Sequence, residues 1–187
     1  MGIEKSAEVR ERRVKIRPFD ERYQESAYEF IREIRREALN DPNADARPRY
    51  KDIHGNCQRF DNENFWIAID EDADKVVGTV GLRFLKDGVG QLIRMGVKSS
   101  FRERGIASRL IGELLLFATK KQYKEIYLTT EIDEAHRKAR EMYENKFTFK
   151  RVGLAEISQE INSLLLADYN IKAIEEGKTL IYKLELE

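Results

Sequence analysis

The feature that most constrains the fold is one amphipathic helix set between two strand-like segments in the middle of the chain. Its apolar stripe recurs at helical spacing and consists of Ile106, Ala107, Leu110, Ile111, Leu114, Leu115 and Ala118. The segment GQLIRMGV before it and the segment KEIYLTTE after it are typical of strands. A strand, helix, strand order predicts two parallel neighbouring strands joined by a right-handed crossover.

The segments on either side predict a sheet around this crossover. NFWIAID and KVVGTVGLRFLKDG predict a hairpin, with one face formed by Val76, Gly78, Val80, Leu82 and Phe84. Further strands are expected at VKIRPF, FKRVGL and TLIYKLEL. Helices are expected at residues 23–39, 50–60 and 135–145, and in part of 158–177. Together these elements predict an α+β fold in three layers, with a mixed sheet between helices.

Composition excludes several classes of protein. A length of 187 residues fits a single domain, 1–187, in which residues 1–12 are expected to be a flexible tail. With 34 basic and 34 acidic residues, no overall field favours nucleic acid or an anionic membrane. One cysteine, Cys57, and two histidines, His54 and His136, argue against disulfides and against a metal site. We therefore expect a cytoplasmic protein without membrane, metal or nucleic-acid partners.

The stretch VKSSFRERGIASRL places Arg102, Arg104 and Arg109 around Gly105, at the start of the central helix. The first turn of a helix offers free backbone N–H groups and the positive end of the helix dipole, and glycine lets a ligand approach closely. This pattern predicts a phosphate-binding turn. The alternative, which these residues alone leave open, is an exposed basic helix start. The stretch lacks the GK[ST] residues that end a P-loop, and it lacks the three-glycine dinucleotide fingerprint.

RMGVKSSFRERGIASRL resembles the acetyl-CoA site of the GNAT superfamily of N-acyltransferases, whose signature is [QR]-x-x-G-x-[GA]. Arg102, Gly105 and Ala107 match it. The following segments keep the order of the family: the helix LIGELLLFATKKQY, the strand IYLTT, the helix AREMY and the strand FKRVG. FATKKQYKEIYLTT is also similar to the camello-type branch. The resemblance implies a GNAT-type, mostly antiparallel sheet of seven or so strands, with a central parallel pair splayed at a β-bulge.

The resemblance also implies how the co-substrate acetyl-CoA is bound. The fourth strand would pair with the pantetheine arm through Met95, Gly96 and Val97. The pyrophosphate would be held by the backbone amides of Glu103, Arg104, Gly105, Ile106, Ala107 and Ser108, beside Arg102. A glycine inside an apolar strand is typical of a bulge or of close backbone approach, so Gly96 is expected to mark the bulge. The alternative is a glycine needed only for packing.

Two residues near the following helix receive roles from the resemblance. Tyr143 stands where the family has the general acid for the departing CoA thiolate; a buried core tyrosine is the alternative. His136 stands seven residues earlier, where the family usually has an asparagine that contacts CoA, and a surface or helix-capping histidine is the alternative. The Gly-Phe pair that usually follows the tyrosine is replaced by Thr148 and Phe149.

The general base is less clearly marked. Several members of the family have a glutamate on the fifth strand where this chain has Thr129. Glu131 lies two residues further on and shares that strand face, and the competing candidates are Gln91, Tyr127 and a water chain. Freeing the lone pair of an α-amine with a pKa near ~8 costs about 1.4 kcal/mol at pH 7, against about 4.6 kcal/mol for a lysine-type amine. A missing carboxylate therefore favours an α-amine as acceptor.

These inferences predict an acetyl-CoA-dependent N-acetyltransferase. It would transfer acetyl to a primary amine of a small molecule, an amino acid or a peptide N-terminus, by direct attack in a ternary complex. Tyr143 and Glu131 would be catalytic, and a homodimer is compatible with the fold. The alternatives are a non-catalytic acyl-CoA sensor with the same fold and a nucleic-acid binder that uses residues 10–13. Nothing in the expected acceptor elements, residues 23–60, 85–89 and 158–177, names the amine.

Overall fold

The computed structural model describes residues 13–166 and 174–186. Within them, seven strands form one sheet in the order β1-β2-β3-β4-β5-β7-β6. The strands are β1 (Val14–Pro18), β2 (Asn64–Asp70), β3 (Lys75–Lys86), β4 (Val89–Val97), β5 (Glu125–Glu131), β6 (Lys150–Val152) and β7 (Thr179–Glu185). The helices are α1 (Gln24–Leu39), α2 (Ile53–Cys57), α3 (Ile106–Lys120), α4 (Arg137–Asn145) and α5 (Gln159–Leu166). Among these described strands, only β4 and β5 are paired in parallel.

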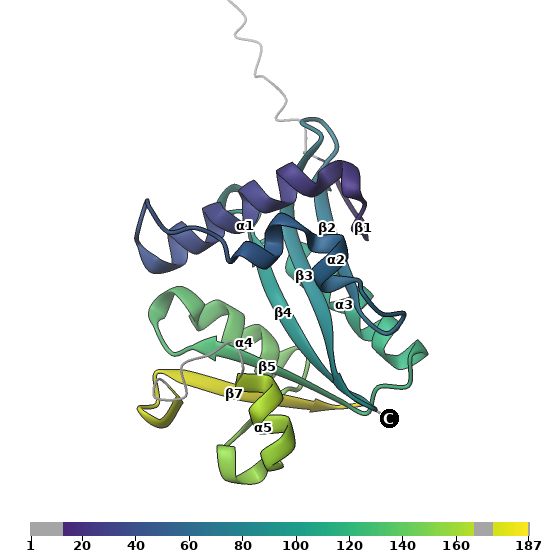
Figure 1. Ribbon diagram of the computed structural model, residues 1–187. Coiled ribbons are helices and arrows are strands. Elements are labelled where there is room, and N and C mark those ends of the chain that lie inside the picture. Colours follow the sequence, from purple (N-terminus) through teal and green to yellow (C-terminus); the bar gives the residue numbers. More distant parts are fainter. Residues whose placement is uncertain (1–12, 167–173, 187) are drawn as a thin grey trace, which may run out of the picture.

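The sheet is covered on both faces, which confirms the α+β class and its three layers (Figure 1). One face packs against α3 and α4 in a core that includes Val80, Leu110 and Tyr143. The other face is covered by α1 and α2 near β2 and β3, and by α5 near β5 and β7. α3 connects the parallel strands β4 and β5, so the predicted strand, helix, strand unit with parallel neighbours is confirmed.

The parallel pair is splayed, as the resemblance implied. β4 and β5 are in register only from Val89 to Gln91, opposite residues 125–127, and then diverge. An extra residue in β4 produces a bulge, because Ile93 faces Gly81 while Gly96 faces Thr79. The bulge carries a left-handed residue, Arg94, with φ 52°. We call the diverging ends of β4 and β5 beyond Gln91 and Tyr127 the fork.

The expectation that Gly96 marks the bulge is wrong, since the left-handed backbone is at Arg94, two residues earlier. Gly96 has a packing role instead: a Cβ there would stand 3.3 Å from Cγ2 of Ile34 on α1. A contact that short requires the Ile34 side chain to move by a few tenths of an ångström. The carbonyl of Arg94 accepts a hydrogen bond from Thr79 Oγ1 at 2.7 Å, so the irregular backbone has its partner within the sheet.

A second irregularity corrects the predicted face of β3. The register of β2 and β3 shifts between Ala68 and Ile69. As a result Val76 packs with α1 and α2, whereas Val80 and Leu82 pack with α3. The predicted face, which grouped Val76 with Val80 and Leu82, is therefore wrong for Val76, because it assumed strict alternation along β3.

The remaining helices differ from the predictions in length. In place of one helix over 50–60, a 3-10 turn at Pro48–Lys51 precedes the short α2, because the Asp52 carboxylate accepts from the Gly55 amide at 2.8 Å and starts a new helix. In the segment 158–177, α5 is helical as expected. Residues 167–173 lie outside the described residues, and so does the expected tail, residues 1–12.

No helix in the described part of the chain has both the length and the apolar character needed to cross a bilayer.

The residue that replaces the usual glycine after Tyr143 gives a stability prediction. Thr148 is exposed and has φ 56°, a left-handed conformation that a β-branched residue adopts only under strain. We expect Thr148→Gly to stabilise the protein by about 1 kcal/mol, which raises the midpoint of thermal unfolding by about 2–4 °C. Calorimetric melts test this. Thr148→Ala keeps a Cβ in the same backbone conformation, and an equal gain from it would contradict the explanation.

Candidate active site

The turn before α3 presents a group of free backbone amides. Gly105 caps the helix in a left-handed conformation with φ 71°, and Glu103 is also left-handed with φ 64°. Within the described residues, none of the six amides of 103–108 donates a hydrogen bond to another residue; the first that does is Arg109, to the carbonyl of Gly105 at 3.1 Å. Unpaired amides at the positive end of a fifteen-residue helix form an anion site. The phosphate-binding turn predicted from the sequence therefore has the geometry it needs.

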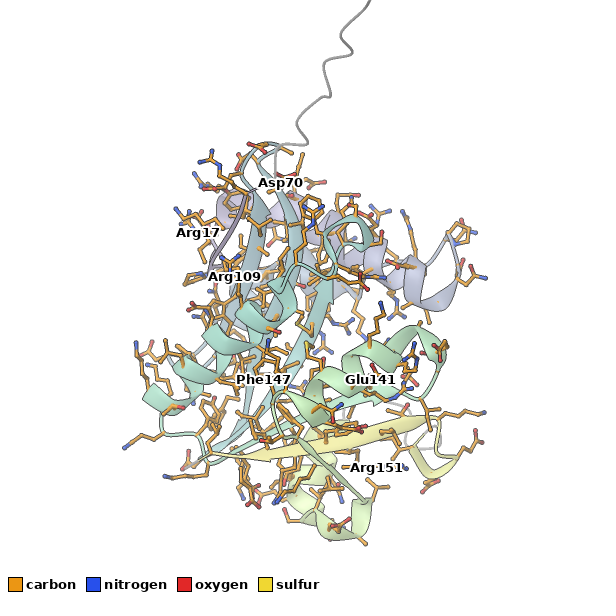
Figure 2. All side chains as sticks on the ribbon, turned by 180° about the vertical axis from the view of Figure 1, so that it is seen from behind. Arg17, Asp70, Arg109, Glu141, Phe147 and Arg151 are labelled. Carbon is orange, nitrogen blue, oxygen red and sulfur yellow. The ribbon has the colours of Figure 1, made fainter. Side chains whose placement is uncertain are left out.

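The three arginines of this stretch do not converge on the turn. Arg102 donates through Nε to the carbonyl of Val97 at 3.0 Å, and its Nη1 is 2.8 Å from a carboxylate oxygen of Glu37 on α1. The Arg104 guanidinium lies over the Phe101 ring, 5.2 Å from its centroid. Arg109 lies on the face shown in Figure 2 and donates to the carbonyl of Val14 on β1 at 3.3 Å. Each arginine thus holds the turn against a different neighbour.

A polar pocket of about 450 Å³ opens beside this turn. It lies between the start of α3 and the start of α4, and its lining residues are Ser99, Arg102, Glu103, Glu134, Ala135, Arg137 and Lys138. Glu103 and Lys138 form an ion pair across it. Of the residues whose amides are free, Glu103 lines this pocket, so the pocket adjoins the start of the turn.

The fork continues the site into the sheet. Beyond Gln91, β4 pairs only with β3, so its other edge has no strand partner among the described residues. The predicted residues Met95 and Val97 lie on this stretch and pack toward α3 and α4. An open strand edge next to an anion-binding turn suits a long ligand that carries both amide groups and a diphosphate, so the residues present fit CoA.

Tyr143 is buried on α4, and only 5% of it is exposed. It belongs to the large apolar cluster on the α3 face of the sheet, which also contains Val97, Phe101 and Ile106. Its ring packs edge-to-face against Phe149 at a centroid distance of 5.8 Å. The predicted acid therefore lies on the same face of the sheet as α3, the helix that carries the predicted amides.

His136 makes a local interaction. It ends the 3-10 turn before α4, where both its backbone N–H and its Nδ1 contact Asp133 Oδ1, at 3.0 and 2.6 Å. Its neighbours Ala135 and Arg137 line the pocket, whereas His136 is not among the lining residues. The contact with Asp133 is the capping role that the sequence left open as the alternative, and a contact with CoA stays a prediction.

The candidate bases lie on the face of the sheet opposite α3 and α4, Gln91 on β4 and Tyr127 and Glu131 on β5. Glu131 ends the strand and its Oε2 accepts a hydrogen bond from Thr179 Oγ1 at 2.9 Å. Burial, followed by the hydrogen bond to the Glu125 carboxylate, raises the pKa of Tyr127. The hydroxyl therefore stays protonated at neutral pH and cannot take the proton of the amine. Thr129 Oγ1 and Gln91 Nε2 are buried and have no hydrogen-bond partner among the described residues. Buried polar atoms without partners are rare, so the fork has places for a water or a ligand.

Comparison with known proteins decides the family. A model described as the acetyltransferase (GNAT) family matches residues 25–149, which include the fork, the amide turn and Tyr143. The chain belongs to the GNAT acetyltransferase family. The resemblance seen in the sequence signature is therefore confirmed.

The curated relatives include N-acetyltransferases, among them members of the N-acetyltransferase 8 group. N-acetylaspartate synthetase of Xenopus tropicalis is 37% identical over 121 residues, covering 64% of this chain and 40% of the relative. N-acetyltransferase 8F1 of Mus musculus is 35% identical over 91 residues, covering 46% of this chain and 37% of the relative. The chain thus spans about two fifths of the length of these relatives.

Solved structures share the GNAT fold at low sequence identity. A GNAT acetyltransferase of Staphylococcus aureus Mu50 superposes with a TM-score of 0.74 at 21% identity, covering 94% of this chain and all of that one. The PaiA N-acetyltransferase of Thermoplasma acidophilum, solved in complex with coenzyme A, gives 0.66 at 16% identity, with 93% and 99% covered. These likenesses confirm the predicted fold.

Cys57 is not a nucleophile in this GNAT domain. Its thiol is buried in α2, and burial raises its pKa to about 12. A thiol that stays protonated at neutral pH cannot carry the acetyl group as a covalent intermediate. Within residues 13–166 and 174–186, no three His, Cys, Asp or Glu side chains gather as a metal site requires.

Reasoning from the sequence missed two groups beside the fork. Arg94 at the bulge donates through Nε to the hydroxyl of Tyr50 at 2.6 Å, and Arg83 donates to Gln91 Oε1. The signal that could have found Arg94 is a charged residue inside the otherwise apolar strand GQLIRMGV. Which face of the sheet the Arg94 side chain lies on was not predictable, because that depends on the bulge.

The amide turn gives a prediction with a matched control. Gly105 and Gly177 have the same left-handed backbone, φ 71° and 70°, and a Cβ at either position would meet nothing within 4 Å. Alanine at either position should destabilise the protein by about 1 kcal/mol. Only Gly105→Ala places a methyl group beside the free amides, and we expect it to weaken CoA binding about tenfold or more in isothermal titration calorimetry. Equal CoA affinity for Gly105→Ala and Gly177→Ala would contradict the assigned turn.

Proposed function

We propose that this protein is an acetyl-CoA-dependent N-acetyltransferase that transfers the acetyl group to a primary amine by direct attack in a ternary complex. The observation that carries the proposal is the set of six free amides beside an open strand edge, with Tyr143 in the same cluster. Bound acetyl-CoA supplies an activated thioester, and the residues of this chain bind, orient and exchange protons.

Binding is assigned to the turn and to β4. The amides of 103–108 hold the diphosphate, and Arg102, which lines the pocket, adds positive charge next to it. The open edge from Met95 to Val97 has backbone groups for the pantetheine arm. A backbone N–H beyond the bulge polarises the carbonyl under attack, as an oxyanion hole does. Holding both substrates in one orientation supplies much of the acceleration.

Proton transfer is assigned to the two sides of the fork. Tyr143, on the α4 side, protonates the departing thiolate. On the opposite face, the amine loses its proton to Glu131, directly or through a water held by Thr129 Oγ1 and Gln91 Nε2, which are buried and have no hydrogen-bond partner among the described residues. This division keeps the acid and the base on opposite sides of the reacting carbonyl.

The names of the relatives support an amine acceptor. They include N-acetylaspartate synthetases and N-acetyltransferases. Thr129 replaces the carboxylate that several members of the family have on the fifth strand. This is consistent with transfer to the amine of a small molecule, an amino acid or a peptide N-terminus, because an α-amine is easier to deprotonate than a lysine-type amine.

A second candidate function is a non-catalytic acyl-CoA sensor with this fold. Two observations favour it: Thr129 stands in place of a strand carboxylate, and Glu131 is engaged by Thr179. A sensor binds acetyl-CoA without turning over any amine, whereas the proposed enzyme releases CoA only when an amine is present.

Removing the hydroxyl of Tyr143 tests the assigned acid. We expect Tyr143→Phe to lower kcat about 100-fold or more, with little change in the KM for acetyl-CoA, because only the proton donor is lost. CoA release measured with a thiol reagent reports the rate. The control is Tyr123→Phe, since Tyr123 is also buried but donates to the carbonyl of Asn62 at 2.6 Å, at the far end of α3. If both variants keep the wild-type kcat, Tyr143 is not the acid.

Replacing Glu131 tests the assigned base. We expect Glu131→Gln to lower kcat/KM about 100-fold at neutral pH, because the amide cannot accept the proton of the amine. Glu125→Gln, on the same face of β5 but at its paired end, is the control and should leave kcat/KM unchanged. An unchanged kcat/KM for Glu131→Gln would assign deprotonation to water alone.

A further inference from the structure

The bulge that opens the fork also gives one arginine a special position. Arg94 has φ 52°, and its side chain contacts Tyr50, which belongs to the layer of α1 and α2. This is the face of the sheet that carries Gln91 and the candidate base, opposite the amide turn and Tyr143. Because Met95 follows at once, the backbone of Arg94 adjoins the strand edge assigned to the thioester arm.

Arg94 has a neutral partner and no ionic one. Its Nε donates to the Tyr50 hydroxyl, and its guanidinium stands 4.7 Å from the centre of the Tyr50 ring. Burial raises the pKa of Tyr50, so that this hydroxyl stays neutral. In residues 13–166 and 174–186, no carboxylate oxygen lies within 4.0 Å of the Arg94 guanidinium, and its two terminal nitrogens have no hydrogen-bond acceptor.

Neither of two acids on the described part of the chain, Glu63 and Glu131, is paired with Arg94. Glu63, 5% exposed, accepts from the amide of Phe84 at 3.2 Å, and its other oxygen is 3.8 Å from Arg59 Nε and has no hydrogen-bond partner among the described residues. Glu131 is hydrogen-bonded to Thr179. A half-buried arginine without an acidic partner is unusual, since a desolvated charge is stabilised mainly by pairing. The face therefore has positive charge available for a ligand.

A second donor lies on the same strand. Gln91 is fully buried, and its Oε1 accepts from Arg83, while its Nε2 has no partner among the described residues. Gln91 stands at the last paired position of β4, where the fork begins. The face of the sheet opposite α3 and α4 thus has one unpartnered amide donor and one guanidinium. These groups favour a substrate amine that also carries negatively charged oxygen atoms.

We propose that Arg94 binds a carboxylate of the acceptor, close to the reacting amine, so that the substrates are amino acids or similar amines with a carboxylate. This inference rests on the proposed function and adds the substrate class. The terminal nitrogens of a guanidinium form a fork that matches a carboxylate, and the Tyr50 hydroxyl holds the side chain by Nε so that this fork stays free. The amine would be placed toward the thioester because the carboxylate is held next to it.

The experiment measures CoA release with wild-type protein and Arg94→Gln. The acceptors are L-phenylalanine, L-leucine and L-aspartate, the α-carboxamides of the first two and the diamide of the third, phenethylamine and spermidine. We expect the wild type to acetylate at least one amino acid, and Arg94→Gln to lower kcat/KM for it about 10- to 100-fold. The value for acceptors without the carboxylate should change little. Each acceptor is compared between the two proteins, because removing a carboxylate also changes the basicity of the amine.

Two further variants separate recognition from folding. Arg17→Gln removes an arginine that pairs with Asp20 at 3.1 Å on the edge strand β1, and should leave every acceptor unchanged. Tyr50→Phe removes the hydroxyl that positions Arg94, and should raise the KM for amino acids with little effect on kcat. CoA affinity of each variant, measured by calorimetry, checks that the co-substrate site is intact.

The outcomes distinguish the two proposals. If the wild type acetylates only acceptors without a carboxylate, or if Arg94→Gln affects amino acids and carboxamides equally, the carboxylate proposal is wrong and the acetyltransferase stands. If the wild type binds acetyl-CoA but acetylates none of the eight acceptors, both the enzyme and its substrate class are contradicted. A loss confined to acceptors with a carboxylate supports both.

Discussion

The site depends on one extra residue in the backbone of β4. The bulge at Arg94 ends the pairing of β4 with β5, and so leaves a strand edge open in the middle of the sheet. Such an edge is normally unstable, because its amides and carbonyls lose their partners. Here Thr79 satisfies the displaced carbonyl of Arg94, and α3, α4 and α5 fill the space on the two faces. The sheet therefore stays folded although one edge of β4 is left open for binding.

The fork gives its two faces different chemistry. Toward α3 and α4 lie the free amides of 103–108 and the buried Tyr143, which suit a diphosphate and a leaving group. Toward α1, α2 and α5 lie Arg94, Gln91 and Thr129, which have donors and acceptors that the protein itself does not use. A thioester lying in the fork would therefore meet its acid from one side and its amine from the other. Gln91 Nε2 and Thr129 Oγ1 have no hydrogen-bond partner among the described residues, so a ligand or a water in the fork can supply one.

Much of this could be predicted from residues close together in the chain. The spacing of apolar residues in α3 and the alternation in the flanking strands predicted the crossover and the parallel pair, because these periods depend on local geometry. Gly105, Arg102 and Ala107 predicted the amide turn, since a free helix start is also a local property. The position of Tyr143 followed from the family pattern, and the structure places it in the same cluster as the turn.

What the sequence by itself determined, then, is the order of elements, the mixed sheet and the anion-binding turn. Only the tertiary structure decided that the bulge is at Arg94 and not at Gly96, and that Val76 packs on the opposite face from Val80. It also decided that Arg102, Arg104 and Arg109 point to three different neighbours. The reason is physical: a bulge and the direction of a long side chain depend on the residue met across the sheet or on another helix, and that partner lies far away in the chain.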